Sequence, residues 1–272
     1  MPSFAVIGAS RGIGLELVRQ LSASPTNTVV VTVRNKEKST YLNDLVRRSE
    51  NNNVHVVEAD VVDQHAMDHA AAEVTKITGG ALDVLVHNAA RTEGENTIKG
   101  FLDYETPEKL DEEFIASFKV NVLGVVHTVN AFLPLLRKGT AKKIIVIGSE
   151  GGDCSLVWRI RLANAAAYGT TKAAENMVAT KYAAELESED FTVASVSPGI
   201  VDVSKTAAES GFYVPSEELM PTVNKIMNGI LAAFPKATTI TPEESCRRLV
   251  SFIDSAGPAD SGIFHPSAEY ID

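Results

Sequence analysis

The sequence predicts an α/β protein whose parallel sheet is doubly wound, with three layers in the order α/β/α. Short apolar runs alternate with helix-like segments over all 272 residues, and a glycine-rich turn separates the first run from the first helix-like segment. No internal repeat, low-complexity tract or Pro/Gly-rich linker divides the chain. We therefore expect a single domain over residues 1–272.

Each expected strand is a short run rich in β-branched residues. These runs occupy residues 4–7, 28–33, 54–58, 82–86, 143–147 and 192–196, and a last strand is expected at 262–264. Helix-like segments separate the runs, so the strands are expected to be parallel. Ligands of such sheets bind outside the carboxyl ends of the strands, so the residues that follow each run should line the site.

The first of these turns is the run Gly8-Ala9-Ser10-Arg11-Gly12-Ile13-Gly14. Glycines there let the backbone turn tightly and approach a pyrophosphate, whose charge is met by the first amides of the following helix. This favours a dinucleotide site of the Rossmann type. Its spacing is G-x-x-x-G-x-G rather than G-x-G-x-x-G, so an ordinary strand-to-helix turn is the alternative. The expected cofactor contacts are Gly8, Ser10, Arg11, Gly12, Ile13 and Gly14.

The second strand ends in Arg34 and Asn35 rather than in an acidic residue. A carboxylate at this place would bind the ribose hydroxyls of NAD, whereas an arginine accommodates the 2'-phosphate of NADP. Arg11 adds a second cation near the same position. The pair therefore favours NADP(H), although either arginine alone is compatible with a solvated surface position.

Composition narrows the class of protein. The chain is 44% apolar and 22% charged with a net charge of -10, which argues against nucleic acid and anionic membrane surfaces as partners. Cys154 and Cys246 are far apart and lack metal-ligand spacing, so we expect a reducing compartment and no metal site. No apolar run approaches the length of a membrane span, and the first strand follows Met1 almost directly; we expect a cytoplasmic protein.

Polar residues follow the later strands. Asp60 and Val61 follow the third strand, where the carboxylate could accept from an adenine amino group, and Ser149 follows the fifth. Tyr168 and Lys172 are four residues apart and share one face of the next helix. An ammonium beside a tyrosine stabilises the phenolate that remains when the hydroxyl protonates a carbonyl oxygen. Alone, such a pair would more often be an exposed helix pair.

Taken in order, these motifs resemble the motif set of the short-chain dehydrogenase/reductase family over nearly the whole chain. Within it, the run from Gly8 to Leu21 and the tail at 262–265 look most like the NADP-dependent carbonyl-reductase branch. The motifs that carry the resemblance are GASRGIG (8–14), HNAA (87–90), Asn121, Ser149, YGTTK (168–172) and Ser197-Pro198-Gly199.

The resemblance implies roles for these residues. Ser149 would hold the substrate carbonyl, Tyr168 would be the general acid or base, and Lys172 would bind the nicotinamide ribose and favour the ionised form of Tyr168. Asn121 would hold a water in the proton relay. Asp60 and Val61 would meet the adenine. The residues expected at the nicotinamide end are Asn88, Ala89, Pro198, Gly199 and Val201.

Some positions depart from the family pattern. Ala90 stands where the family more often has glycine, and Val203 replaces a threonine that commonly helps bind the carboxamide, with Ser204 as a possible substitute. Residues 150–165 look like an inserted loop on the substrate side, and residues 204–234 resemble a mobile substrate lid.

Three residues of the insertion suggest substrate contacts. Trp158 could stack on an aromatic ketone while Arg159 or Arg161 pairs with an acidic group on it. Alternatively, Trp158 anchors the insertion to the protein body or to a neighbouring subunit. Phe212, Tyr213 and Met220 of the expected lid are candidate pocket residues, although apolar residues at helix spacing more often belong to a core.

These observations together predict the NADPH-dependent reduction of a small-molecule ketone or aldehyde, with Tyr168 as the general acid. By resemblance, the helices of residues 121–136 and 168–186 would build a homodimer or homotetramer. Two alternatives stay open. One is a non-redox family member, such as a cyclase, dehydratase or isomerase; the other is a binding protein that senses NADP(H).

Overall fold

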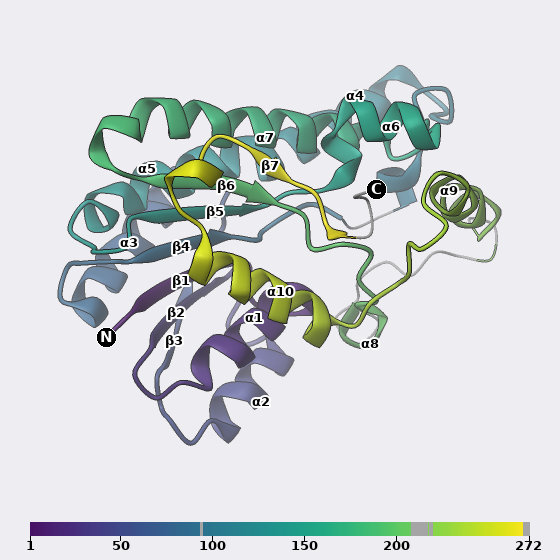
Figure 1. Cartoon of the computed structure of the whole chain (residues 1–272). Coiled ribbons are helices and arrows are strands. Elements are labelled where there is room, and N and C mark those ends of the chain that lie inside the picture. The colour runs from purple at the N-terminus through teal and green to yellow at the C-terminus, as the bar shows by residue number, and fades with distance from the viewer. Residues whose placement is uncertain (93–94, 208–216, 218–219, 269–272) are drawn as a thin grey trace.

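The computed structural model describes residues 1–92, 95–207, 217 and 220–268. Within them, seven strands form one parallel sheet in the order β3-β2-β1-β4-β5-β6-β7 (Figure 1). The strands are β1 (Ser3–Ile7), β2 (Thr28–Val33), β3 (Val54–Glu58), β4 (Val84–His87), β5 (Lys143–Ile147), β6 (Thr192–Val196) and β7 (Phe264–His265). The order reverses between β1 and β4, which confirms the doubly wound Rossmann fold and places a ligand crevice at that switch.

The helices connect successive strands and close the chain. They are α1 (Gly12–Ser22), α2 (Thr40–Arg48), α3 (Gln64–Thr78), α4 (Pro107–Phe118), α5 (Gly124–Leu136), α6 (Cys154–Ile160), α7 (Ala166–Leu186), α8 (Ser204–Ala207), α9 (Met220–Ala233) and α10 (Pro242–Ser255). Residues Lys119–Leu123 form a π-helical turn, η2, between α4 and α5.

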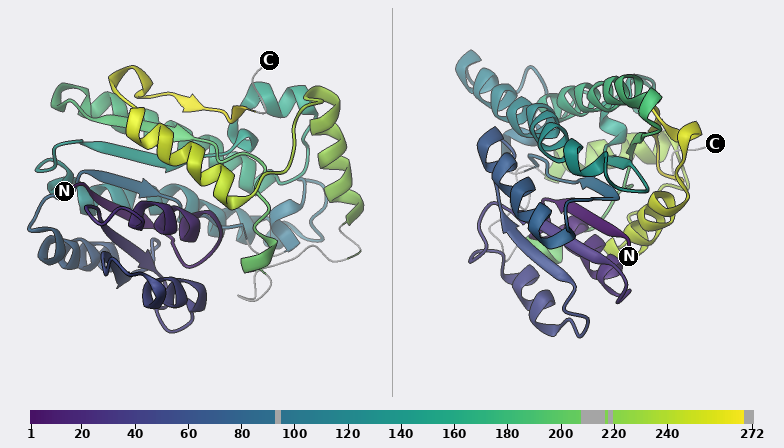
Figure 2. Two further views of the ribbon diagram at one scale, coloured as in Figure 1. Left: turned by 60° about the horizontal axis from the view of Figure 1, so that its bottom comes forward. Right: turned by 90° about the vertical axis from the view of Figure 1, so that its left-hand side faces the viewer.

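The sheet has a core on each face, which gives the three layers (Figure 2). One core packs α3, α5 and α7 on the sheet around residues such as Phe132 and Leu186. The other packs α1, α2 and α10 on the opposite face around residues such as Leu17 and Leu249. Burial of strand residues on both sides explains why the strand sequences are apolar runs rather than alternating patterns.

The fourth strand differs from its expected position. It covers Val84–His87 instead of residues 82–86, so His87 belongs to the strand and is fully buried. Its neighbour in β5 is Val146, which faces the layer of α3, α5 and α7. His87 therefore points under α7 rather than toward the turn that follows the strand.

One continuous helical stretch, residues 107–136, is long and apolar enough to meet a length and composition test for a membrane span. This differs from the expectation that no segment has that character. Its most apolar window has a mean hydropathy of 1.3, and half of that window is buried inside the protein. Because α5 supplies Val125, Val129 and Phe132 to the core, the apolar composition is that of a buried helix.

The expected insertion is more regular than a loop. Residues Glu150–Gly152 form a 3-10 turn, η3, and α6 follows it. Asp153 caps α6 by accepting a hydrogen bond from the amide of Leu156 at 2.9 Å, which the sequence pattern did not reveal. Ile160 of α6 packs with Ile230 and Phe234, at the carboxyl end of the sheet, so α6 and α9 form one small cluster there (Figure 1).

Candidate active site

A cavity of about 390 Å³ lies at the carboxyl ends of the strands, near the point between β1 and β4 where the strand order reverses. Most residues expected to bind the cofactor line it, which places the turns after β1, β2, β3, β4 and β6 around one space. The predicted residues that line it are Gly8, Ser10, Arg11, Gly12, Ile13, Arg34, Asp60, Val61, Asn88, Ala89, Tyr168, Lys172, Pro198, Gly199 and Val201. The predicted residues Gly14, Asn35, Asn121 and Ser149 lie outside this lining.

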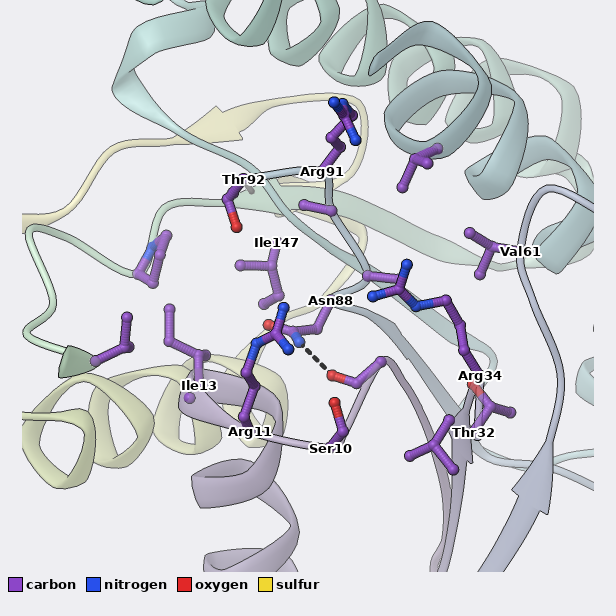
Figure 3. A pocket seen from close by; sticks show the side chains of 18 of the residues that line it. Ser10, Arg11, Ile13, Thr32, Arg34, Val61, Asn88, Arg91, Thr92 and Ile147 are labelled. Carbon is purple, nitrogen blue, oxygen red and sulfur yellow. Dashed lines mark hydrogen bonds between the residues drawn. The ribbon is translucent and has the colours of Figure 1, made fainter. Parts of the chain in front are cut away.

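The glycine turn is held by close backbone packing. A Cβ on Gly14 would lie 2.2 Å from the carbonyl oxygen of Gly8 and 2.6 Å from Nδ2 of Asn88. Nδ2 of Asn88 donates a hydrogen bond to that same Gly8 oxygen at 2.7 Å (Figure 3). Gly14 is therefore required for packing rather than for cofactor contact. Asn88 has a second role that its motif did not predict, which is to fix the turn to β4.

Thr206 completes the turn from the other side of the cavity. Its Oγ1 accepts a hydrogen bond from the amide of Gly12 at 3.0 Å. Sequence reasoning considered Val203 and Ser204 here. Val203 and Thr206 line the cavity, whereas Ser204 begins α8, its amide donating to Asp202. The helical turn of α8 carries Thr206 back over the site, and no pattern in the sequence marked this hydroxyl.

The two arginines flank the turn. Arg11 and Arg34 both line the cavity, and Figure 3 shows their side chains extending toward the same part of it from α1 and β2. Asn35 instead accepts a hydrogen bond from the amide of Lys38 at 2.8 Å and stabilises the turn after β2. Asn35 thus has a local role in the turn, and its cofactor contact stays a prediction.

Ser149 and Tyr168 meet across Gly151. A Cβ on Gly151 would lie 3.4 Å from Oγ of Ser149 and 3.8 Å from Cε1 of Tyr168. Oγ of Ser149 accepts a hydrogen bond from the amide of Gly151 at 3.1 Å, which fixes the side chain at the start of η3. Since this contact uses a lone pair, the hydroxyl proton of Ser149 remains available to an oxygen acceptor.

Lys172 lies one turn after Tyr168 on α7, and the side chain is buried. Its Nζ lies 5.8 Å from the centre of the Tyr168 ring and donates a hydrogen bond to the carbonyl oxygen of Ile147 at 2.8 Å. Burial lowers the pKa of Lys172, but the charge of Glu175 and the proximity of Tyr168 outweigh this effect and raise that pKa above its usual value. The ammonium is thus kept charged beside the tyrosine.

Asn121 lies in the π turn, fully buried. Its Oδ1 accepts a hydrogen bond from the amide of Arg91 at 2.7 Å, and its Nδ2 donates to Oγ1 of Thr171 at 2.9 Å. The side chain therefore ties the segment after β4 to the first turns of α7. Each end of the amide keeps one further hydrogen-bonding position, and the expected water-holding role of Asn121 stays a prediction.

An ion pair between a partly exposed arginine and a buried glutamate supports the same region. Arg91 lines the cavity and donates to both carboxylate oxygens of Glu113 on α4, at 2.9 and 2.8 Å. Glu113 is 3% exposed and also accepts a hydrogen bond from Ser117. Sequence reasoning missed this pair, because a glutamate in a charged helix normally belongs to the solvated face.

The insertion does not supply the substrate contacts expected of it. Trp158 is 72% exposed, lies outside the cavity lining, and is covered by the guanidinium of Arg161 at 3.8 Å from the ring. The guanidinium of Arg159 lies 4.1 Å from the ring of Phe234 and donates to Ala233. These contacts bind α6 to itself and to the end of α9. Met220 begins α9, outside the lining of the cavity, and Phe212 and Tyr213 lie outside the described residues.

Relatives with the same organisation are found among fungal proteins. Short-chain dehydrogenase/reductase AacuF of Aspergillus aculeatus is 40% identical over 258 residues, 94% of this chain and 93% of the relative. Short-chain dehydrogenase/reductase atnB of an Arthrinium species is 37% identical, covering 97% and 96%. Short chain dehydrogenase virK of Hypocrea virens is 38% identical, covering 94% and 93%.

Solved structures share the fold. The carbonyl reductase Sniffer of Drosophila melanogaster superposes with a TM-score of 0.74 at 23% identity, covering 98% of this chain and 96% of that one. The NADPH-bound carbonyl reductase from chicken fatty liver gives 0.75 at 22% identity, covering 98% and 91%. Residues 3–211 match the family model described as short chain dehydrogenase. With this match, and with relatives at up to 40% identity along its length, the chain belongs to the short-chain dehydrogenase/reductase family of oxidoreductases.

Proposed function

We propose that this protein reduces a ketone or aldehyde to an alcohol with NADPH, and that Tyr168 is the general acid. The observation that carries the proposal is that Tyr168 and Lys172 line a cavity that Arg11 and Arg34 also line, while Ser149 lies next to Tyr168 across Gly151. A hydride acceptor would then meet a proton donor and a hydrogen-bond donor at the same place.

The residues present fit a nicotinamide dinucleotide. Gly8, with a φ of +84°, and Gly14 leave no room for a Cβ, so the backbone is shaped for close approach of a pyrophosphate to α1. Two arginines at the end of β2 and at the start of α1 favour the 2'-phosphate of NADPH. NADPH bound in this cavity would supply a hydride to the carbonyl carbon.

The side chains of this chain then handle the carbonyl oxygen. Ser149 donates its hydroxyl proton in a hydrogen bond to that oxygen while Gly151 holds Oγ in place. Tyr168 transfers its hydroxyl proton to the oxygen as negative charge develops there, and the ammonium of Lys172 stabilises the resulting phenolate. Asn121 and Thr171 keep the start of α7, and therefore Tyr168, in position.

The substrate would enter beside α6 and α9. These helices form one cluster beyond the carboxyl end of the sheet. We propose that the segment expected as a lid, 204–234, acts as one and that α6 supports its α9 end; residues 208–216 and 218–219 of this segment lie outside the described residues. Arg159 packs on the ring of Phe234 and Arg161 packs on the ring of Trp158. These arginines therefore give no reason to expect an acidic group on the substrate.

We further propose a homodimer through α4, α5 and α7. Four apolar side chains on α4, η2 and α7 are exposed, and a partner copy would cover them. Their exposed fractions are 55% for Ile115, 45% for Phe118, 38% for Leu123 and 57% for Met177. Size-exclusion chromatography with light scattering tests this directly. A monomer at micromolar concentration would contradict the proposal.

The test of the reaction is NADPH oxidation against aromatic ketones, quinones, polyketide-like ketones and α-dicarbonyls, with NADH in parallel. Turnover that prefers NADPH, and that falls by about 10²-fold or more in Tyr168→Phe, is the expected result. Tight NADPH binding without oxidation of any carbonyl would instead support a non-redox enzyme or a sensor. Equal turnover by Tyr168→Phe would refute Tyr168 as the acid.

A further inference from the structure

Glu175 is a buried carboxylate that the reaction outlined above does not use. It lies on the face of α7 that carries Tyr168 and Lys172, three residues beyond the lysine, and its side chain is fully buried. Burying an ionisable carboxyl group in a protein interior costs several kcal/mol unless a partner compensates it. Its presence beside the lysine therefore calls for a role.

The partner of Glu175 is Lys172. Nζ of Lys172 lies 2.6 Å from Oε2 of Glu175, and in the described part of the chain no donor in hydrogen-bond geometry reaches either carboxylate oxygen. The contact is thus an ion pair that depends on charge more than on alignment. Because the carboxylate has no other donor to hold it, the two groups depend on each other.

Two titratable rings, those of His87 and Tyr168, interact with Lys172 among the residues that the structure describes. His87, at the end of β4, interacts electrostatically with the charge of Lys172. Burial and this charge lower the pKa of His87 to about 3, so the imidazole is neutral at physiological pH. Glu175 is therefore the carboxylate that forms an ion pair with Lys172 in the part of the chain that the structure describes.

We propose that Glu175 is a positioning residue, the counter-ion that holds the ammonium of Lys172 in place and in its charged form beneath Tyr168. A lysine ammonium has three N–H donors. The carbonyl oxygen of Ile147 accepts one of them, and Glu175 lies 2.6 Å from Nζ as an ion pair, so donors remain for the cavity that Lys172 lines. The carboxylate thus holds the ammonium in place by charge and keeps a desolvated amine protonated.

This inference rests on the proposed reductase function, and its first test is a pH profile. Glu175→Gln preserves size but removes the charge, and Glu175→Leu also removes the acceptor. Without the counter-ion, desolvation favours the neutral amine of Lys172, so the alkaline limb of kcat/KM for carbonyl reduction should move down by about one pH unit or more. Glu185→Gln, an exposed position on the same helix, is the matched control and should retain the wild-type profile.

The outcomes separate the two proposals. A wild-type enzyme that turns over, together with variants that lose stability but keep the wild-type pH profile, would show that Glu175 is only structural and would overturn the inference. Rescue of the profile by Glu175→Asp would support it. If the wild type reduces no carbonyl, the proposed function fails while the ion pair is still tested by the second experiment.

The second test needs no activity. In protein labelled with ¹³C at the glutamate carboxyl carbons, the resonance lost in Glu175→Gln identifies Glu175. Burial raises the pKa of Glu175 to about 7 although Lys172 lowers it, so this resonance should titrate near neutrality. Lys172→Met should move the titration to higher pH by about one unit or more. No movement would mean that the two groups do not interact, and the inference would be wrong.

Discussion

His87→Leu should raise the free energy of unfolding at mildly acidic pH relative to the wild type. The imidazole is fully buried, no described residue forms a hydrogen bond with its ring nitrogens, and its pKa is lowered from 6.5 to about 3 by burial and by the charge of Lys172. The native state therefore binds fewer protons than the unfolded state as pH falls below 6.5. Stability contributed by neutral His87 is complete above that pH and is lost progressively below it.

The magnitude follows from the size of this shift. A difference of roughly 3.5 pH units at about 1.36 kcal/mol per unit corresponds to about 5 kcal/mol once both states are protonated. Between about pH 8 and about pH 5.5, only roughly 1 to 2 kcal/mol of this is lost. Glu175 acts in the opposite direction, because its raised pKa makes the native state bind more protons than the unfolded state as pH falls through about 7. Its contribution over the same interval is a gain of about 2 kcal/mol.

In the wild type, the contributions of His87 and Glu175 to the free energy of unfolding should therefore nearly cancel between these pH values. In His87→Leu only the contribution of Glu175 remains, so this variant should become more stable as the pH falls. Urea unfolding followed by far-UV circular dichroism at both pH values measures the free energy of unfolding. Relative to wild type, His87→Leu should gain roughly 1 to 2 kcal/mol in the free energy of unfolding on going to the lower pH. His65→Leu, at an exposed position on α3, is the control. Equal pH dependence of wild type and His87→Leu would refute the reasoning.

Three further substitutions test other parts of the structure. Gly14→Ala should lower the free energy of unfolding by about 3 kcal/mol or more, because the new Cβ would lie 2.2 Å from a backbone oxygen. Gly257→Ala is the control and should cost far less, since nothing lies within 4 Å of its Cβ position. Urea unfolding of both variants measures the two losses, and equal losses would contradict the packing argument. Arg34→Asp replaces a cation with an anion at the proposed phosphate site, so it should raise the KM for NADPH and lower the ratio of kcat/KM for NADPH to that for NADH by about 10-fold or more. An unchanged ratio would mean that Arg34 does not select the cofactor. Glu113→Gln should destabilise the protein by about 3 kcal/mol, measured as a lower urea midpoint, because it leaves the guanidinium of Arg91 without its buried anion; a loss below about 0.5 kcal/mol would mean that solvent compensates that charge.

Much of the fold could be predicted because each determinant is local. Apolar runs and their spacing gave the strand positions to within two residues, and Gly8 to Gly14 marked the ligand-binding end of the sheet. The structure brings Ser149 together with Tyr168 and Lys172, as their motifs predict. These residues follow strands or lie on one helix face, so the pattern alone indicates their position.

The remaining features depend on contacts between distant segments. Glu175 and Glu113 look like ordinary helix-surface acids until α7 and α4 are placed against the rest of the chain. Thr206 reaches Gly12 across 194 positions of sequence, a contact that periodicity cannot indicate. For Trp158 the sequence leaves open whether the ring meets the substrate or anchors the insertion; in the structure the ring is 72% exposed and stacks with Arg161.

The π turn at Lys119–Leu123 has a consequence for how α4 and α5 are phased. A π turn accommodates one residue more than an α-helical path would, so it offsets the two helices by about 100° of rotation. The offset lets Glu113 face Arg91 while Phe132, further along, faces the sheet. Deleting a single residue here would restore an unbroken α-helix and rotate one of these two faces out of register. The length of this short segment, and not only its composition, therefore keeps Asn121 pointing at α7.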